Sequence, residues 1–193
     1  MENNRTPQII VLSHKDFDAF CHNNGYVDET VEKDDTKAFI SIEDTEECLK
    51  YYLEDDESKH WFESDHPNVL NMDFDDLPCE HRDWHGHIFK GMSDEQADRM
   101  VEFIERNMEG EPRKDFIIHC RAGISRSQAV GMFLWAFYQE YFYDNVQWSQ
   151  NSSEHEGYNR YVYFKLRNAY YKKHGNKQFR YETVRLQETV QDN

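Results

Sequence analysis

Short apolar runs separated by polar stretches set the pattern of this chain. Four of these runs are rich in β-branched and aromatic residues and break off at polar positions. Runs of this length, apolar at successive positions, are typical of strands that are buried on both faces of a sheet. The pattern therefore predicts four strands, at Gln8–Ser13, Lys37–Ile42, Asn68–Phe74 and Asp115–His119.

Helical patterns lie between these runs. In Asp94–Met108 the apolar residues recur at the spacing of one helix face, and Ser93 and Gln96 are placed to form a capping box at its start. A shorter helix is expected at Asp16–Asn23. The acidic stretch Glu46–Leu53 fits either a short helix or a solvated loop.

The second half of the chain is richer in helical pattern. Ser127–Tyr141 is almost entirely apolar and aromatic, so we expect a central, buried helix there. Asp144–Gly157 is polar and is expected to form an exposed excursion. A second aromatic helix is expected at Asn159–Lys173, and a last short helix at Arg180–Val190.

The order of these elements indicates the fold class. Strands that alternate with helices are typical of an α/β fold, in which helices cover both faces of a mostly parallel sheet. We expect a central sheet of four to five strands and a single domain that spans residues 1–193. In such sheets, ligands bind at the carboxyl ends of the strands.

Composition narrows the classes of partner. The formal net charge is −16, and the mean hydropathy of −1.00 reflects a charged surface, because the chain still contains 13 Phe and 12 Tyr. An acidic protein repels a phosphate backbone, so no nucleic-acid partner is expected. No apolar run approaches the roughly 20 residues that span a bilayer, so no membrane partner is expected. Oligomeric state stays open.

Cysteine usage indicates a compartment. The four cysteines, Cys21, Cys48, Cys79 and Cys120, have no paired spacing, and the N-terminus lacks the apolar region of a signal peptide. We therefore expect a reducing, cytoplasmic environment, which suits a protein with a working thiol.

The segment Phe116–Ser127 carries the strongest chemical signal. Its apolar run ends in His119 and Cys120, five residues then separate Cys120 from Arg126, and a helical pattern follows. A helix N-terminus and a nearby arginine lower the pKa of a cysteine thiol, and backbone N–H groups with a planar guanidinium hold an anion. The pattern predicts an anion cradle around a thiol, made by Arg121, Ala122, Gly123, Ile124, Ser125 and Arg126.

The run HCRAGISRS resembles the signature loop of the cysteine-dependent protein tyrosine phosphatases, most closely the small dual-specificity-type members of bacteria and their viruses. The resemblance implies that Cys120 is a nucleophile that forms a phosphocysteine, and that Arg126 binds phosphate. It implies that Ser127 helps the thiolate leave and that His119 orders the loop and tunes the thiol. It also implies a phosphatase-like fold and a reaction that needs no metal or cofactor.

A phosphatase of this kind needs a proton donor opposite the nucleophile. In the resembling family this is an aspartate on a loop that follows the preceding parallel strand. Asp76 is favoured here because of its place at the strand end, with Asp75 and Asp83 as alternatives. Asp75 taken alone fits better as a residue that caps a turn.

Two kinds of polar segment are interpreted as solvated surface. Cys79, His81, His85 and His87 have spacing that could ligate zinc, but structural zinc sites usually draw their ligands from two separate knuckles, so a solvated loop is favoured. The acidic runs at Asp28–Asp35 and Glu43–Asp56 are interpreted as solvated surface, the first of them a surface connection.

The leading hypothesis is a phosphatase that acts on phosphotyrosine in proteins, with phosphoserine and phosphothreonine as further candidate substrates. Alternatives are a phosphatase of phosphoinositides, inositol phosphates or RNA 5′ ends, or a phosphate-binding module without turnover. Arg121 is the only cation between Cys120 and Arg126, and this disfavours the highly phosphorylated substrates. A sulfurtransferase or an arsenate reductase fits the Arg-Ser ending less well.

Overall fold

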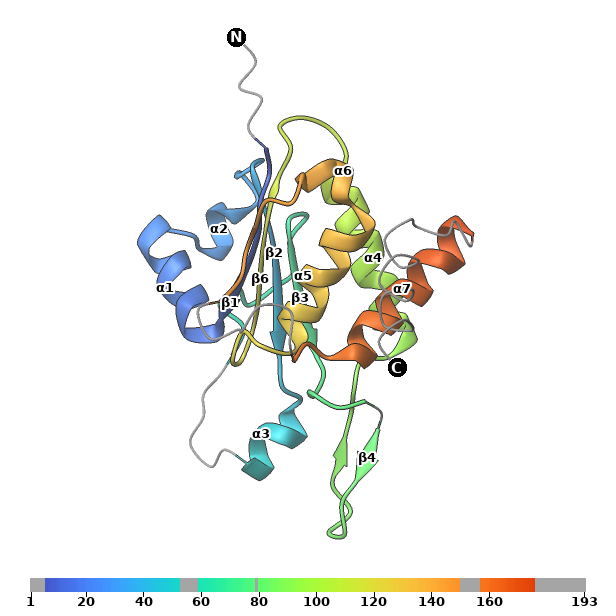
Figure 1. Cartoon of the computed structure of the whole chain (residues 1–193). Coiled ribbons are helices and arrows are strands. Elements are labelled where there is room, and N and C mark those ends of the chain that lie inside the picture. Colours follow the sequence, from blue (N-terminus) through green and yellow to red (C-terminus); the bar gives the residue numbers. More distant parts are fainter. Residues whose placement is uncertain (1–5, 53–58, 79, 150–156, 176–193) are drawn as a thin grey trace.

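A five-stranded parallel sheet forms the centre of the molecule (Figure 1). The structure, a computed structural model, describes residues 6–52, 59–78, 80–149 and 157–175. The strand order is β3-β2-β6-β1-β7, so β6 lies in the middle with β2 and β1 as its neighbours. The strands are β1 (Ile9–Ser13), β2 (Lys37–Glu43), β3 (Val69–Asp73), β6 (Asp115–Cys120) and β7 (Val146–Gln147).

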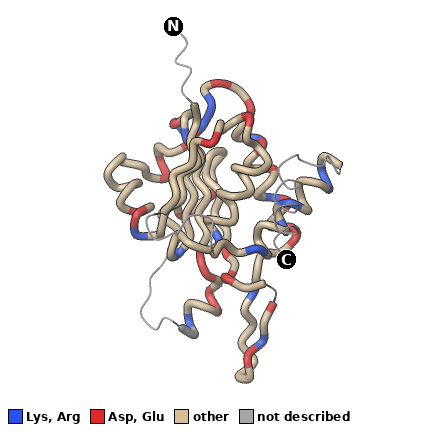
Figure 2. The backbone as a smooth tube through the Cα atoms, in the orientation of Figure 1, with Lys and Arg blue, Asp and Glu red and all other residues tan. Residues whose placement is uncertain are grey.

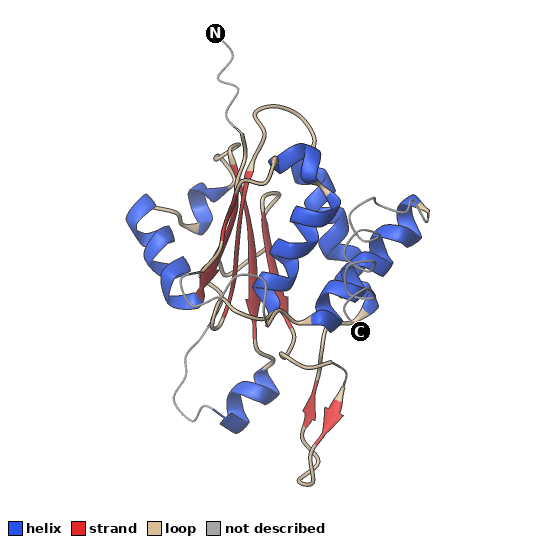
Figure 3. Cartoon of the chain, viewed as in Figure 1, coloured by secondary structure: helices blue, strands red, loops and turns tan. Residues whose placement is uncertain are grey.

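Helices cover both faces of this sheet, as Figures 1 and 3 show. One face carries α1 and α2, and the other carries α4, α5 and α7. The α/β class with a mostly parallel central sheet is therefore confirmed. The helices are α1 (His14–Asn24), α2 (Asp28–Val31), α3 (Glu46–Tyr52), α4 (Asp94–Met108), α5 (Arg126–Phe137), α6 (Gln139–Phe142) and α7 (Arg160–His174).

The alternation of side chains along β6 divides the interior into two cores. Phe116 and Ile118 belong to the larger core, under α4, α5 and α7, whereas Ile117 belongs to the smaller one, under α1. All three side chains are fully buried. Burial of such a side chain contributes about 1.5–3 kcal/mol, and this explains why the central strand is an uninterrupted apolar run.

Several boundaries follow from local signals in the sequence. Ser93 and Gln96 form the expected capping box, and α4 has the predicted bounds. Asn159 caps α7 through its side chain. Gly25 ends α1 in the left-handed region that favours glycine, with φ +69°. Of the two options for the acidic stretch that follows β2, the short helix is correct.

Other predictions are wrong, incomplete or untested. The long helix expected at Ser127–Tyr141 is two helices, because the backbone at Tyr138 leaves the helical region (φ −127°, ψ 34°). The expected excursion after it contributes the edge strand β7. Asp28–Asp35 contains the short helix α2. The expected helix at Arg180–Val190 lies outside the described residues.

A two-stranded hairpin interrupts the loop after β3, and the sequence did not predict it. It consists of β4 (His81–Arg82) and β5 (Ile88–Phe89). The hairpin and α3 both project beyond the carboxyl ends of the sheet strands (Figure 1). Within the described ranges, no helix combines the length and the apolar character that crossing a membrane requires.

Candidate active site

Cys120 is the last residue of the central strand and lies in register with Ser13 of β1. Its side chain is buried, with 2% exposure. The Sγ atom lies 3.1 Å from the Oγ of Ser127, in the first turn of α5. The sheet and the helix therefore bring together the thiol and the hydroxyl that the sequence analysis singled out.

Gly123 fits the loop closely against β1. Its φ is +72°, and a Cβ built there would lie 2.7 Å from the backbone N of Ser13 and 2.8 Å from the backbone of Leu12. Only glycine combines that conformation with so close an approach of two backbones. A further hydrogen bond, from His14 N–H to the carbonyl of Arg121, ties the loop to the start of α1.

The N-terminus of α5 faces the loop without a side-chain cap. Ser125 occupies the capping position, but its hydroxyl makes no capping hydrogen bond and donates to Asp76 Oδ1 at 2.7 Å. The first N–H groups of a helix have no partner within the helix. Together with the helix dipole, these groups favour an anion at this point.

Arg126 is buried, with 3% exposure, and is held by oxygen atoms at the ends of two strands. Its Nη1 donates to the carbonyls of Phe74 (2.6 Å) and Glu43 (3.1 Å) and lies 2.8 Å from Asp44 Oδ1. Burial lowers the pKa of the guanidinium, but Asp44, Cys120 and other negative groups outweigh it and raise the pKa. Arg126 is therefore charged at every physiological pH.

One donor of this guanidinium remains available. The Nε of Arg126 is buried and has no hydrogen-bond partner within the part of the chain that the structure describes. A buried unpaired N–H costs free energy, and a bound anion would satisfy it.

Asp44 is a site residue that the sequence analysis missed. It was part of the acidic run interpreted as solvated surface, and that interpretation is wrong for Glu43 and Asp44, which are 2% and 8% exposed. Asp44 also lies 3.4 Å from Nη1 of Arg121. Its position directly after β2 was the available signal, since the carboxyl ends of parallel strands meet at one edge.

Figure 2 shows acidic residues, in red, gathered beyond the carboxyl ends of the sheet strands. Glu43 ends β2 and Asp44 follows it, and Asp75 and Asp76 follow β3. The buried positive charge of Arg126 lies among them.

Asp76 contacts the cradle loop directly. Its exposed carboxylate accepts hydrogen bonds at Oδ1 from the Ser125 hydroxyl (2.7 Å) and from Asn159 Nδ2 (2.6 Å). The backbone N–H of Asn159 also donates to the carbonyl of Ser125. Asn159 is a second residue that the sequence analysis did not assign to the site, because it is distant in the chain.

The two alternative carboxylates have structural surroundings. Asp75 is buried and accepts from the backbone N–H groups of Thr45 (2.9 Å) and Lys90 (2.7 Å), which agrees with its interpretation as a capping residue. Asp83 lies in the hairpin and accepts from the backbone N–H groups of His85 and His87, both at 2.9 Å. Burial tends to raise the pKa of Asp83, but the hydrogen bonds outweigh it and lower the pKa to about 2. A carboxyl with so low a pKa is a poor proton donor at neutral pH.

His119 lies directly behind Cys120 and is completely buried. Its ring stacks on Phe17, with centroids 4.0 Å apart, and its Nε2 lies 2.7 Å from the Oγ of Ser41. Burial lowers the pKa of His119 well below 6.5, and electrostatic repulsion from neighbouring groups, His14 and Arg126 among them, lowers it further. The imidazole is therefore neutral.

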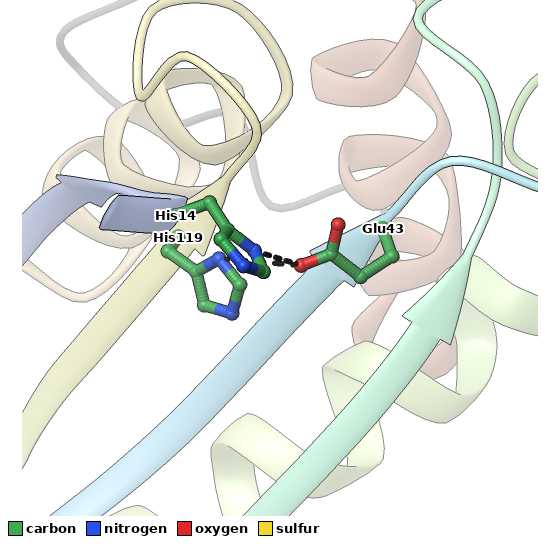
Figure 4. A group of neighbouring side chains, drawn as sticks. All are labelled: His14, Glu43 and His119. Carbon is green, nitrogen blue, oxygen red and sulfur yellow. Dashed lines mark hydrogen bonds and ion pairs between the residues drawn. The ribbon is translucent and has the colours of Figure 1, made fainter. Parts of the chain in front are cut away.

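Metal-ligating atoms meet in two groups within the described residues. One group contains His14, Glu43 and His119 (Figure 4), and the other contains Asp44, Cys48 and Asp75. Neither includes the histidines of the hairpin, His81, His85 and His87. Cys79, the fourth member of the zinc pattern considered in the sequence, lies outside the described residues.

The fold and the site thus define an α/β protein in which the central strand delivers a cysteine to a glycine-containing loop and a helix N-terminus. Comparison of this chain with protein-family models, with curated proteins and with solved structures finds no match.

Proposed function

We propose that the protein is a cysteine-dependent phosphatase that hydrolyses phosphotyrosine in proteins, with phosphoserine and phosphothreonine as further candidate substrates. The observation that carries the proposal is the position of Cys120, at the end of the central strand with Ser127 Oγ at 3.1 Å and a buried arginine beside it. This arrangement supports what the resemblance of HCRAGISRS implies.

The first step is attack on phosphorus. The Cys120 thiolate forms the S–P bond while the bond from phosphorus to the leaving oxygen breaks. The Nε of Arg126 and the uncapped N–H groups of α5 hold the non-bridging oxygens, whose charge they stabilise. Asp76, protonated, gives its proton to the leaving oxygen.

The second step hydrolyses the phosphocysteine and regenerates the free enzyme. Asp76, now ionised, takes a proton from a water molecule that attacks the phosphocysteine, and the S–P bond breaks. Ser127 donates a hydrogen bond to the departing thiolate, for which its Oγ is well situated. His119 acts as a positioning residue, since its neutral ring is locked between Phe17 and Ser41.

Residues around the cradle bear on the class of substrate. A hollow of about 350 Å³ lies between the start of α3 and the hairpin, lined by Thr45, Glu46, Glu47, Gly86, Ile88 and Lys90. Thr45 and Lys90 donate to Asp75, the neighbour of Asp76. Such an open, mixed surface suits a peptide chain that presents one phosphorylated side chain. We also propose a reducing, cytoplasmic location, which agrees with the free thiols of Cys21, Cys48 and Cys120.

Two cysteine variants test the proposal. Cys120→Ser should abolish hydrolysis of an aryl phosphate, because a hydroxyl at this position is a far weaker nucleophile. Cys48→Ser is the matched control and should keep full activity, since burial and Asp75 raise the pKa of the Cys48 thiol to about 12. Undiminished turnover by Cys120→Ser would refute the assignment.

The class of substrate can then be determined by substrate trapping with inactive variants. Cys120→Ser and Asp76→Ala should retain bound substrate, and phosphopeptides should be captured in preference to phosphoinositides, inositol phosphates or RNA 5′ ends. Capture of a non-protein phosphate instead would keep the chemistry but replace the proposed substrate.

A further inference from the structure

A second polar cluster lies behind the cradle, where His14, Glu43 and His119 converge from three neighbouring segments (Figure 4). His14 begins α1 directly after β1, Glu43 ends β2, and His119 belongs to β6. Glu43 Oε1 lies 2.7 Å from the Nδ1 of His14 and 3.7 Å from the Nδ1 of His119. Each of the three residues offers a ligand atom within 4.8 Å of the others.

Two buried atoms of this cluster lack partners. Neither the Nδ1 of His119 nor the Oε2 of Glu43 has a hydrogen-bond partner in the described ranges. His119 is 0% exposed and Glu43 is 2% exposed, so bulk water does not satisfy them. Buried polar atoms are rarely left unpaired, and such atoms in a native structure point to a missing water, proton or ion.

A chain of polar contacts connects His119 with Asp73 through Ser41 and His60. His60 Nε2 lies 2.9 Å from Asp73, His60 Nδ1 lies 2.6 Å from Ser41 Oγ, and Ser41 Oγ lies 2.7 Å from His119 Nε2. His119 contacts Ser41 through Nε2, so the ring nitrogen that faces the carboxylate of Glu43 is Nδ1. In the tautomer that donates from Nε2 to Ser41, this Nδ1 offers a lone pair. Two acceptors that face each other favour a cation between them.

Both histidines also have the outer partners that metal-bound histidines have. Such a histidine usually donates its other ring N–H to a carboxylate or another acceptor, which fixes the tautomer. His14 places its Nε2 3.2 Å from Asp18 Oδ2, and His119 places its Nε2 2.7 Å from Ser41 Oγ. In both rings this leaves Nδ1, the atom that faces Glu43, as the ligand.

The distances fit a small first-row ion. Tetrahedral zinc with bonds of about 2.0–2.1 Å separates neighbouring ligand atoms by about 3.3 Å. The two separations of 2.7 and 3.7 Å lie on either side of that value, so adjustments of about 0.5 Å would complete the site. Two imidazoles and one carboxylate form a donor set that prefers zinc and similar ions to magnesium.

We propose that His14, Glu43 and His119 bind an imidazole-preferring divalent cation of the zinc class, with an open fourth position. The second group of ligand atoms carries no such proposal. Its Asp44 is paired with Arg126, and the Asp75 oxygens already accept from two backbone N–H groups.

The cation would brace the base of the cradle. His119 precedes Cys120, the carbonyl of Glu43 accepts from Arg126, and the N–H of His14 donates to the carbonyl of Arg121. Each ligand is therefore one bond or one residue away from the loop. The cation takes no part in the proposed hydrolysis, and the inference does not depend on that activity.

The test measures zinc affinity in the full-length Cys120→Ser protein, which removes the active-site thiol as a competing ligand. Titration of Zn²⁺ against a chromophoric chelator should give one tight site per chain, a higher melting temperature with zinc, and no competition from Mg²⁺. His14→Ala and Glu43→Gln should each weaken binding by about 100-fold or more, because each removes a direct ligand. Glu43→Gln keeps the shape of the side chain, so it tests the site even if His14→Ala fails to fold.

Two other histidines serve as controls. His22→Ala, an exposed position on α1, and His85→Ala, in the hairpin, should leave zinc affinity unchanged. Absence of a tight site, retention of affinity by both His14→Ala and Glu43→Gln, or loss of affinity in His85→Ala would each overturn the proposal. Melting curves without zinc confirm that each variant is folded.

Discussion

Two segments leave the carboxyl edge of the sheet toward the same site, and they are built in opposite ways. The loop after β6 is fixed along its length, with Gly123 against the backbone of β1 and hydrogen bonds to α1 and Asn159. The segment after β3 is anchored at its root, where Asp75 is buried. Beyond that root it extends into a hairpin whose Trp84 is 87% exposed.

The difference teaches where each chemical role belongs. An attacking thiol needs a fixed position under the phosphorus atom, and a loop packed between two backbones provides it. A proton donor must contact leaving groups of several shapes. Asp76 suits that role because it is exposed and follows a fixed root, while its neighbour Asp75 anchors that root.

The largest expected effect comes from the anchored arginine of the fixed loop. Arg126→Lys should lower kcat/KM for an aryl phosphate by about 10³-fold, because lysine cannot supply the planar donors or the contacts to Asp44. Arg121→Lys is the control, since its side chain is 39% exposed and lies 3.4 Å from Asp44. It should lose less than about tenfold. Equal losses of kcat/KM in the two variants would show that the buried Arg126 has no special role in phosphate binding.

The packing of the fixed loop can be tested with two glycines of the same backbone conformation. Gly123→Ala should lower the free energy of unfolding by about 3 kcal/mol, because its Cβ meets the β1 backbone and its φ is strained. Gly25→Ala has φ +69° but nothing within 4 Å, so it should cost only about 1 kcal/mol. Urea unfolding measures both. Similar losses would mean that the close approach to β1 does not matter.

The two adjacent carboxylates sharpen the comparison within the second segment. Asp76→Asn should lower kcat for phenyl phosphate by about 100-fold and spare substrates with good leaving groups, because only a poor leaving group needs the proton. Asp75→Asn should instead lower the free energy of unfolding by about 1–3 kcal/mol, since it leaves buried N–H groups less well paired. If Asp75→Asn produced the leaving-group dependence, the two roles would have to be exchanged.

The smallest effect concerns the hairpin. In the folded protein the pKa of Asp83 is lowered to about 2 from an ordinary 3.8. Ionised Asp83 therefore stabilises the folded hairpin fully above pH 3.8, and this stabilisation is lost as the pH falls toward 2. The amide resonances of His85 and His87, followed by NMR, should therefore shift between pH 4 and pH 2. Asp83→Asn should remove that transition. A transition that persists in this variant would show that ionisation of Asp83 does not cause it.

Local patterns predicted much of this molecule. The apolar runs give β1, β2, β3 and β6, and the capping box gives α4. The break at Tyr138 accompanies contacts of its side chain with Glu105 and Tyr170, which are distant in the chain. Each hairpin strand is two residues long, too short to show a periodic pattern. The two-residue strand β7 exists only because β1 offers it an edge.

The site divides along the same line. Cys120, Arg126 and Ser127 are close in sequence, so one motif reveals all three. Asp44 and Asn159 reach the cradle only through the fold, and Asp44 belongs to a run whose charge suggested solvent. The pairing of β2 with β6 buries it next to Arg126, where the opposite charge compensates for lost hydration.

The most direct measurement of the central claim is the detection of the phosphocysteine. The protein is quenched in acid during turnover of an aryl phosphate, and its peptides are mapped by mass spectrometry. Phosphate should appear on the peptide that contains Cys120 and on no other, and Cys120→Ser should remain unlabelled. Rapid turnover with no phosphate on Cys120, or with phosphate on another residue, would contradict the account.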